Sequence, residues 1–442
     1  MGLSRIFAQS DFHAAGAGMH RLAADLYPIC RSITGRGVRQ SLQKLQSRIP
    51  IQIREVPSGT QVFDWTVPKE WNIRQAYLED ASGNRVVDFE KSNLHVLNYS
   101  TPIDARVSLA ELRPHLFTIP EHPEWIPYRT SYYKENWGFC LSNRQLEDLP
   151  EGIYHAYIDS SLADGHLTYG EYFLAGESSE EVLISAHICH PSLANDNLSG
   201  LAVATFLAAF LGQQKLRYSY RFLFAPGTIG AITWLALNKE GAKRIRHGLI
   251  LTCVGDAGGF HYKRSRKHNA AIDRAAAHIL RCCGEPAETL DFSPYGYDER
   301  QYCSPGFDLP VGCLMRSVWG QFPQYHSSAD NLEFIYPEKL LGSLRVCLSI
   351  LDVLENDRCY RNESPWCEPQ LGKRNLYRTT GGVGVETGNM ARLWVLNQSD
   401  GQHSLLDIAE RAGIPFPVIL DAAEVLTEGG LLSPLSESAP AI

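Results

Sequence analysis

One stretch of the chain, residues 181–211, combines a buried strand, a polar loop and an apolar helix. It opens with the aliphatic run Val182, Leu183 and Ile184, which is typical of a strand in the interior of a parallel sheet. From Leu198 onward, large apolar residues recur at helical spacing. The loop therefore joins the carboxyl end of a strand to the amino terminus of a helix, where open α/β sheets place their sites.

The loop in this stretch is richer in coordinating side chains than a connection needs. It contains His187, His190, Asn195, Asp196 and Asn197. A single His or Asp in a loop is usually a turn or capping residue. Zinc sites take His and carboxylate ligands, and catalytic ones leave a position open for water. We interpret the loop as half of a metal site.

Strand-like and helix-like segments alternate after this stretch. Strands are predicted at 218–224, 247–254 and 309–315, and helices at 229–238 and 337–354. The alternation indicates an α/β fold, a doubly wound and mostly parallel sheet. Loops after successive strands should meet at one edge of that sheet. They bring two further candidate ligands, Asp256 in CVGDAG and His326 in QYHSSADN.

Changes in composition divide the chain into three parts. The sheet domain is expected at 1–50 and 169–371, a β-rich insertion at 51–168, and a separate tail at 389–442, after a linker rich in Gly, Arg and Thr at 372–388. The insertion consists of short β-like runs separated by turns. Tryptophan and tyrosine are dense at 121–142, where they either line a substrate cleft or pack in the core.

Residues 13–49 are expected to be helical and to cover the sheet, with a break at Gly35-Arg36-Gly37. Arg31, Ser32 and Thr34 precede this break. They either face a cleft or are solvated residues at a helix end.

The tail has the layout of a winged helix: helix, turn, two further helices and a Gly-Gly turn. A DNA reader needs a basic recognition helix. The candidate helix, residues 415–426, contains Asp421 and Glu424 and no Lys or Arg. Packing or protein contact is therefore the expected role of the tail, and nucleic acid is not expected as a partner.

The charge and the cysteines narrow the class of protein further. The 442 residues include 41 basic and 49 acidic side chains, a net charge of -8, without a long basic run that would follow phosphates. The 11 cysteines are scattered, which is typical of reduced thiols and not of a disulfide framework. Neither a signal peptide nor an apolar run of about 18 residues is found. We expect a cytoplasmic protein without a membrane partner.

At this point the sequence resembles the zinc aminopeptidase superfamily. The resemblance rests on His187, on Asp196-Asn197-Leu198-Ser199-Gly200, on Asp256 and on Tyr325-His326. More closely, AHICHPSLANDNLSG, GYDERQYCSPGFDLPVG and FPQYHSSADN are similar to bacterial aminopeptidase-like proteins with a β-rich insertion and a winged-helix tail, often associated with polysaccharide or natural-product biosynthesis. The resemblance implies two metal positions that share an Asp, with His187 and Asp256 on one and His326 plus a Glu on the other.

Two departures from this pattern affect the chemistry. The strand after the Asp-Asn-x-Ser-Gly helix should end in two glutamates, a general base and a metal ligand, but Gly227 and Thr228 stand there. The residue two positions after His187, commonly Asp, is Cys189. We therefore expect one zinc per chain instead of two, held by His187, Asp196 and either His326 or Asp256. His190 is expected to orient a ligand instead of binding the metal.

The missing base must come from another segment, and the run Tyr297-Asp298-Glu299-Arg300-Gln301-Tyr302 is the candidate. Glu299 is our first choice as catalytic base, with Asp298, Asp256 or a carboxylate of the substrate as alternatives. Arg300 and Tyr302 are candidate substrate-binding residues. The competing interpretation is a charged cluster on a solvated turn.

These observations favour an enzyme, a zinc-dependent amide hydrolase that acts on a small peptide or biosynthetic conjugate. An acyl-transfer or cyclising enzyme on the same scaffold is the first alternative. A non-catalytic binding protein with a degenerate peptidase site is the second. Assembly into a homo-oligomer is left open.

Overall fold

The computed structural model describes residues 2–9, 14–374, 376 and 387–435. The chain forms two compact units. One comprises Asp11–Ala270 and Pro286–Leu344, and the other Met1–Ser10, Ala271–Glu285 and Arg345–Ile442.

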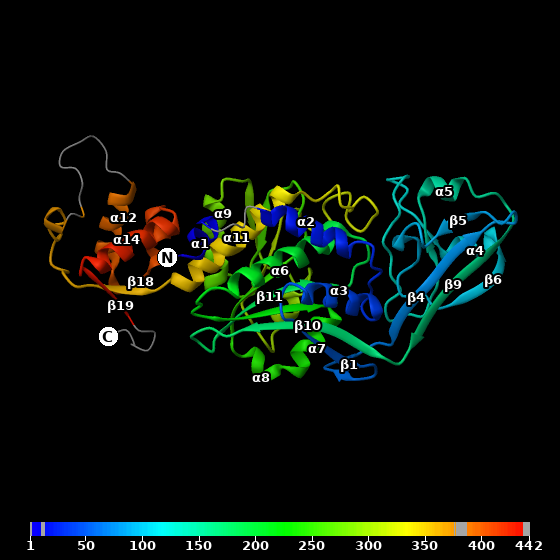
Figure 1. Ribbon diagram of the computed structural model, residues 1–442, viewed down its shortest axis with the longest axis horizontal. Helices are drawn as coiled ribbons and strands as arrows, with labels where there is room; N and C mark the ends of the chain where they lie inside the picture. The colour runs from blue at the N-terminus through cyan, green and yellow to red at the C-terminus, as the bar shows by residue number, and fades with distance from the viewer. Residues whose placement is uncertain (1, 10–13, 375, 377–386, 436–442) are drawn as a thin grey trace. The chain divides into compact units, whose positions relative to one another are not determined.

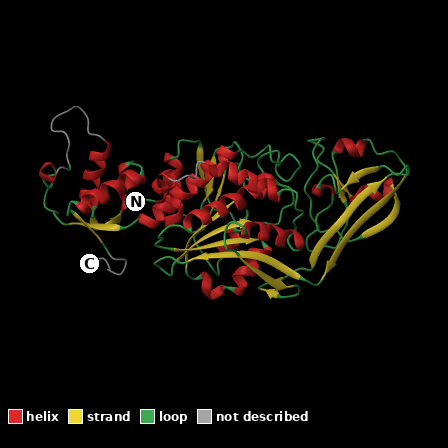
Figure 2. Cartoon of the chain, viewed as in Figure 1, coloured by secondary structure: helices red, strands yellow, loops and turns green. Residues whose placement is uncertain are grey.

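The first unit is built on an eight-stranded mixed sheet in the order β1-β10-β12-β11-β13-β16-β14-β15. Figure 2 draws the strands in yellow and the helices in red. Its strands are β1 (Gln52–Pro57), β10 (His166–Leu174), β11 (Glu181–His187), β12 (Ser219–Ala225), β13 (Ile245–Leu251), β14 (Phe260–Lys263), β15 (Ala287–Leu290) and β16 (Val311–Met315). The four inner strands, β12, β11, β13 and β16, run parallel. The predicted α/β class is confirmed.

Strand β11 lies between two parallel neighbours, and all seven of its residues are buried. This explains its unbroken aliphatic run, because a strand covered on both faces has no solvent side to alternate with. At its carboxyl end His187 pairs with Ala225 of β12. The loop after β12, with Gly227 and Thr228, therefore starts beside His187.

Helices cover both faces of this sheet (Figure 1), with α6 and α3 on one face and α7 on the other. The helices of this unit are α2 (Ala15–Leu26), α3 (Arg36–Gln46), α6 (Gly200–Leu211), α7 (Ile229–Leu237), α8 (Lys239–Ala242), α10 (Glu299–Tyr302) and the start of α11 (Pro337–Asn356). The segment 194–211 is long and apolar enough to cross a membrane, but 89% of it is buried inside the fold. It is the core helix of the sheet.

The residues before α3 are buried, contrary to the interpretation as solvated helix-end residues. Arg31, Ser32 and Thr34 are each 1% exposed. Arg31 donates to the carbonyls of Leu26 and His190, and Ser32 donates to Asn98. This segment therefore ties the end of α2 to the loop after β11.

The insertion contains a four-stranded sheet in the order β5-β4-β9-β6. Its elements are β4 (Glu70–Glu79), β5 (Arg85–Asp88), β6 (Ile103–Ser108), β9 (Ile153–Ala163), the short pairs β2 (Gln61–Val62) with β3 (Trp65–Thr66) and β7 (Leu116–Phe117) with β8 (Phe139–Cys140), and the helical turns η2 (Asn93–His95), α4 (Leu109–Leu112), η3 (Arg113–His115) and α5 (Asn143–Glu147). Strand β1 falls in the range predicted as insertion, yet it pairs with β10 in the main sheet. The β pattern alone does not reveal which sheet a strand joins.

The second unit contains the winged helix. Its elements are α1 (Leu3–Gln9), α9 (Ala271–Cys282), the end of α11, β17 (Cys359–Asn362), η5 (Gly372–Arg374), α12 (Thr387–Gln398), β18 (Asp400–Ser404), α13 (Leu405–Ala412), α14 (Phe416–Glu428) and β19 (Leu432–Pro434). Strand β17 is the middle strand of a sheet ordered β18-β17-β19, so this unit reaches further back than the predicted start at 389. The predicted linker at 372–388 lies largely outside the described residues.

All eleven cysteines are free thiols, six of them buried. The expected absence of a disulfide framework agrees with this arrangement.

A buried ion cluster fixes the start of β11 and supplies a test of the sheet. Glu181 is fully buried and accepts hydrogen bonds from Arg221 and Arg244. Replacing it with alanine leaves the half-buried Arg221 without one of its partners, and we expect Glu181→Ala to lower the free energy of unfolding by about 3 kcal/mol. Urea denaturation measures the change. The exposed ion pair of Glu240 with Lys243 serves as control, and a Glu240→Ala variant as destabilised as Glu181→Ala would contradict this account.

Candidate metal and catalytic site

The loop after β11 is held in place by one buried carboxylate from a distant segment. Asp330 accepts the main-chain N–H of Asn195 through Oδ1 at 2.6 Å and that of Asp196 through Oδ2 at 2.9 Å. Residues Ala194–Ser199 form a π-helical turn, η4, inside which Asp196 and Asn197 leave helical dihedral angles. Because the backbone of Asp196 is not helical, helical hydrogen bonds cannot fix it, and Asp330 supplies the acceptor for its N–H instead.

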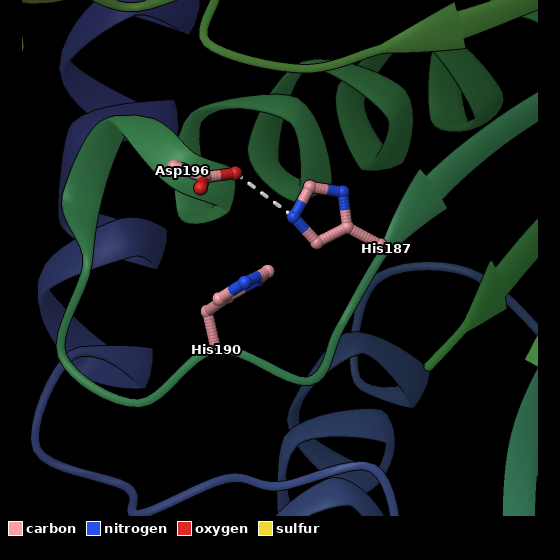
Figure 3. Close-up of side chains that lie close together, drawn as sticks. All are labelled: His187, His190 and Asp196. Carbon is pink, nitrogen blue, oxygen red and sulfur yellow. Dashed lines mark ion pairs between the residues drawn. The ribbon is translucent and has the colours of Figure 1, made fainter. Parts of the chain in front are cut away.

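Three side chains of this loop converge (Figure 3). The ligand atoms of His187, His190 and Asp196 all lie within 4.8 Å of one another. His187 comes from the last position of β11, His190 from the loop, and Asp196 from η4. The structure therefore brings His190 into the cluster itself, where the sequence suggested only an orienting role.

Asp196 is the centre of the cluster. Its Oδ1 lies 2.9 Å from the His187 Nε2 and its Oδ2 lies 3.0 Å from the His326 Nε2. The Tyr297 hydroxyl donates to Oδ1 at 2.7 Å, and the Tyr297 ring stacks on His187 at 4.7 Å. Burial opposes ionisation of Asp196, but the neighbouring imidazoles of His190, His187 and His326 outweigh it and hold its pKa well below the usual range.

The donor set fits a metal ion. The His187 Nε2 is buried and, although close to the Asp196 carboxylate, makes no hydrogen bond with acceptable geometry. A ring nitrogen and a carboxylate oxygen that face the same point suit two ligands of one metal ion. Two imidazoles and one carboxylate match the ligands that zinc takes in catalytic sites.

Asp256 is placed outside this cluster. Its Oδ2 accepts from the Asn195 amide at 2.7 Å, and its Oδ1 accepts from Gly258 and from the Ser317 hydroxyl, both at 2.7 Å. Both oxygens are thus engaged in tying the loops after β11, β13 and β16 together. The sequence correctly predicted Asp256 at the edge of the sheet that carries the site. Its side chain, however, connects the loops and does not join the metal cluster.

Glu299 is also directed elsewhere. It is fully buried and pairs with Lys263 of β14, Nζ to Oε1 at 2.8 Å. Tyr302 is buried in the core, with its hydroxyl 3.4 Å from the Ser185 hydroxyl. Neither position suits the base and substrate contact expected of them. Arg300 remains near the loop after β12, since its Nη2 lies 3.4 Å from the Thr228 hydroxyl.

Asp298, the neighbour of Glu299, is at the edge of the cluster. Its Oδ1 accepts the main-chain N–H of Thr228 at 2.6 Å. Burial raises the pKa of Asp298 to about 6, against the lowering effects of that hydrogen bond and of the His187 charge. On the other side of the same turn, the Gly227 N–H donates to the Cys189 Sγ at 3.2 Å.

An aromatic side chain of the insertion also reaches the cluster. The Tyr128 ring packs edge-on against His190 at 5.0 Å and against His326 at 5.1 Å, and the Tyr128 N–H donates to the His326 carbonyl. Tyr128 is 4% exposed, so this aromatic residue packs in the core, as one of the two interpretations expected, and lies against the imidazoles of the cluster. Tyr297 and Asp330 were missed, although they lie in the same YDER and SADN runs as predicted residues.

Comparison with known proteins agrees with this fold. The chain matches, at 13% identity and a TM-score of 0.56, a solved zinc aminopeptidase from Bacillus subtilis, over 76% of this chain and 93% of that one. At 48% identity and a TM-score of 0.93 it matches the crystal structure of a Clostridium acetobutylicum protein described as a peptidase, over 98% of this chain and 100% of that one. The architecture is that of the zinc aminopeptidases, with a winged helix at the carboxyl end.

Sequence matches show the family to which the chain belongs. Residues 20–357 match the model described as Domain of unknown function (DUF4910), and residues 358–434 match a winged helix-turn-helix. A Clostridium acetobutylicum protein named for polysaccharide biosynthesis and an aminopeptidase-like domain is 51% identical over 418 residues, 94% of this chain and 96% of that protein. The chain belongs to the DUF4910 family.

The support of the loop by Asp330 can be tested directly. In Asp330→Asn one main-chain N–H of the loop faces an amide NH₂ instead of an acceptor, so we expect the free energy of unfolding to fall by about 2 kcal/mol. Urea denaturation measures the loss. Glu333→Gln makes the same change from carboxyl to amide at an exposed position nearby and should leave stability unchanged. Equal stability of the Asp330→Asn variant and the wild type would show that Asp330 does not hold the loop.

Proposed function

We propose that this protein is a zinc-dependent, aminopeptidase-like amide hydrolase. The observation that supports this most is the position of Asp196, whose two oxygens each face an imidazole nitrogen, His187 at 2.9 Å and His326 at 3.0 Å, with His190 beside them. A buried cluster of this composition has no structural need for three imidazoles. It suits a metal ion at the edge of the sheet where α/β folds place their sites.

One zinc ion per chain is proposed, held by His187, His190 and Asp196. His326 then donates its Nε2–H to the Oδ2 of Asp196 and fixes the orientation of that carboxylate, as a second layer of contacts does at many metal sites. Asp256 is not included, because both its oxygens are engaged in other hydrogen bonds. Bound zinc would acidify a water and polarise a carbonyl oxygen.

The substrate is proposed to be a small peptide-like or biosynthetic conjugate with an amide bond. The name of the Clostridium relative refers to polysaccharide biosynthesis, so N-acylated and aminoacylated sugars belong among the candidates, together with short peptides. Turnover of a panel of aminoacyl anilides, short peptides and N-acyl sugars tests this proposal. A zinc-loaded protein that hydrolyses none of them would support the non-catalytic alternative instead.

The ligand assignment predicts a graded response to substitution. His187→Ala and His190→Ala each remove a direct donor and should abolish tight zinc binding, whereas His326→Ala should weaken zinc affinity by about 10- to 100-fold. Elemental analysis and competition with a chelator measure both effects. Two tightly held metals per wild-type chain, or full zinc retention in His190→Ala, would contradict the proposed ligand set.

The winged helix is proposed to bind no nucleic acid. The first residue of α14 donates its N–H to the buried His278 of α9, Phe416 N to Nε2 at 3.0 Å, and Asp421 of α14 pairs with Arg5 of α1. The helix that would enter a DNA groove is thus engaged within its own unit. A cytoplasmic location is proposed from the eleven free thiols.

This role for the winged helix predicts no salt-dependent binding of duplex DNA by the intact protein. The reason is the acidic α14, which carries Asp421, Glu424 and Glu428 without a basic residue. Fluorescence anisotropy with a labelled duplex at two salt concentrations makes the measurement. Binding that weakens steeply with salt would refute the prediction.

A further inference from the structure

The loop after β12 lacks a carboxylate next to His187, although it starts beside that residue. Residues 225–230 read Ala-Pro-Gly-Thr-Ile-Gly. A Cβ added at Gly227 would lie 3.5 Å from the Cys189 Sγ and 3.7 Å from the His187 Cβ, which is ordinary van der Waals contact. A side chain at this position would therefore begin beside His187 and Cys189, and the chain has none there.

A carboxylate from a different segment reaches the same turn. The Asp298 Oδ1 accepts the Thr228 N–H at 2.6 Å, and the preceding residue, Tyr297, both covers the His187 ring and donates to Asp196. Tyr297 thus contacts His187 and Asp196, and the next residue, Asp298, contacts the turn beside them. Asp298 is anchored at the cluster through its neighbour as well as through its own hydrogen bond.

Asp298 differs from the other buried acids near the site in what it is bonded to. Glu299 pairs with Lys263 through Oε1, Asp330 accepts two main-chain N–H groups, and Asp256 accepts four hydrogen bonds. Asp298 is 3% exposed and, among the described residues, forms no ion pair and accepts one hydrogen bond, on Oδ1. Its Oδ2 accepts no hydrogen bond from the described residues and, unlike the Glu299 Oε2, does not share its carboxylate with a paired ammonium group.

We propose that Asp298 is the catalytic base of this enzyme, taking over from a different loop the position that Gly227 leaves without a side chain. The inference rests on the proposed amide hydrolysis. In the reaction, a water molecule forms the new C–O bond to the amide carbonyl carbon while Asp298 accepts one of its protons. The C–N bond then breaks as that proton passes to the nitrogen, which gives a carboxylic acid and an amine.

The environment of Asp298 suits this exchange. Burial raises its pKa to about 6, so the carboxylate is ionised at neutral pH yet holds a proton more readily than an exposed aspartate. Efficient general bases have a pKa close to the working pH. The hydrogen bond from Thr228 fixes one oxygen and leaves the other to accept the proton.

Asp298→Asn is the direct test. Asparagine keeps an oxygen for the Thr228 N–H but cannot accept the proton, so kcat should fall by about 10² to 10⁴ with KM little changed. Zinc content by elemental analysis and zinc affinity by chelator competition should match the wild type, because Asp298 is not a ligand. A kcat within tenfold of the wild type, or loss of zinc, would overturn the proposal.

A second variant moves the carboxylate back to the turn. Asp298→Asn combined with Gly227→Glu places a carboxylate where a Cβ has room, and it should recover at least tenfold of the lost kcat. A double variant no faster than Asp298→Asn would count against a shared position for the two side chains.

Asp352→Asn is the matched control. Asp352 is a buried aspartate that accepts the main-chain N–H of Leu3 at 2.8 Å and belongs to the other unit, so its replacement should leave kcat and zinc content unchanged. If the wild-type protein is inactive on the whole substrate panel, the proposed function and this inference are both wrong. If the wild type is active and the Asp298→Asn variant is equally active, only this inference is wrong.

Discussion

The structure of the site depends on one carboxylate that is shared between two imidazoles. Asp196 faces His187 with one oxygen and His326 with the other. Its main-chain N–H donates to Asp330, which fixes the backbone. These contacts hold together the end of β11, the η4 turn and the loop with His326 and Asp330. A carboxylate buried this deeply would be costly without such partners, so the geometry of His187, His326 and the η4 turn is interdependent.

The loops around this carboxylate are connected by a second network that contains no metal donor. Asn195 donates to Asp256 and accepts from the Gly255 N–H at 2.9 Å, and Ser317 also donates to Asp256. These bonds connect the ends of β11, β13 and β16. The edge of the sheet is therefore rigid before any ligand binds, which is the condition for holding ligands at fixed separations.

The sequence predicted the sheet and the main members of the cluster because both follow from local patterns. His187, Asp196 and His326 stand at strand ends or in recognisable runs, and alternating apolar segments define the strands. The prediction from sequence failed where the role of a residue depends on the direction of its side chain. Asp298 directly precedes α10 and Glu299 begins it, and a step of one residue in a helix turns the side chain by about 100°. Glu299 therefore meets Lys263 while Asp298 meets Thr228.

The second unit is discontinuous in sequence. Helix α9 ends at Cys282 and the winged helix begins only at residue 358, yet Arg274 pairs with Asp407 and Glu410 of α13, and His278 accepts from Phe416. During synthesis on the ribosome, α9 emerges long before these partners exist. The side of α9 that carries Arg274 and His278 therefore has no partners until the carboxyl-terminal helices are made, and a chain broken off before α13 leaves these two side chains without them.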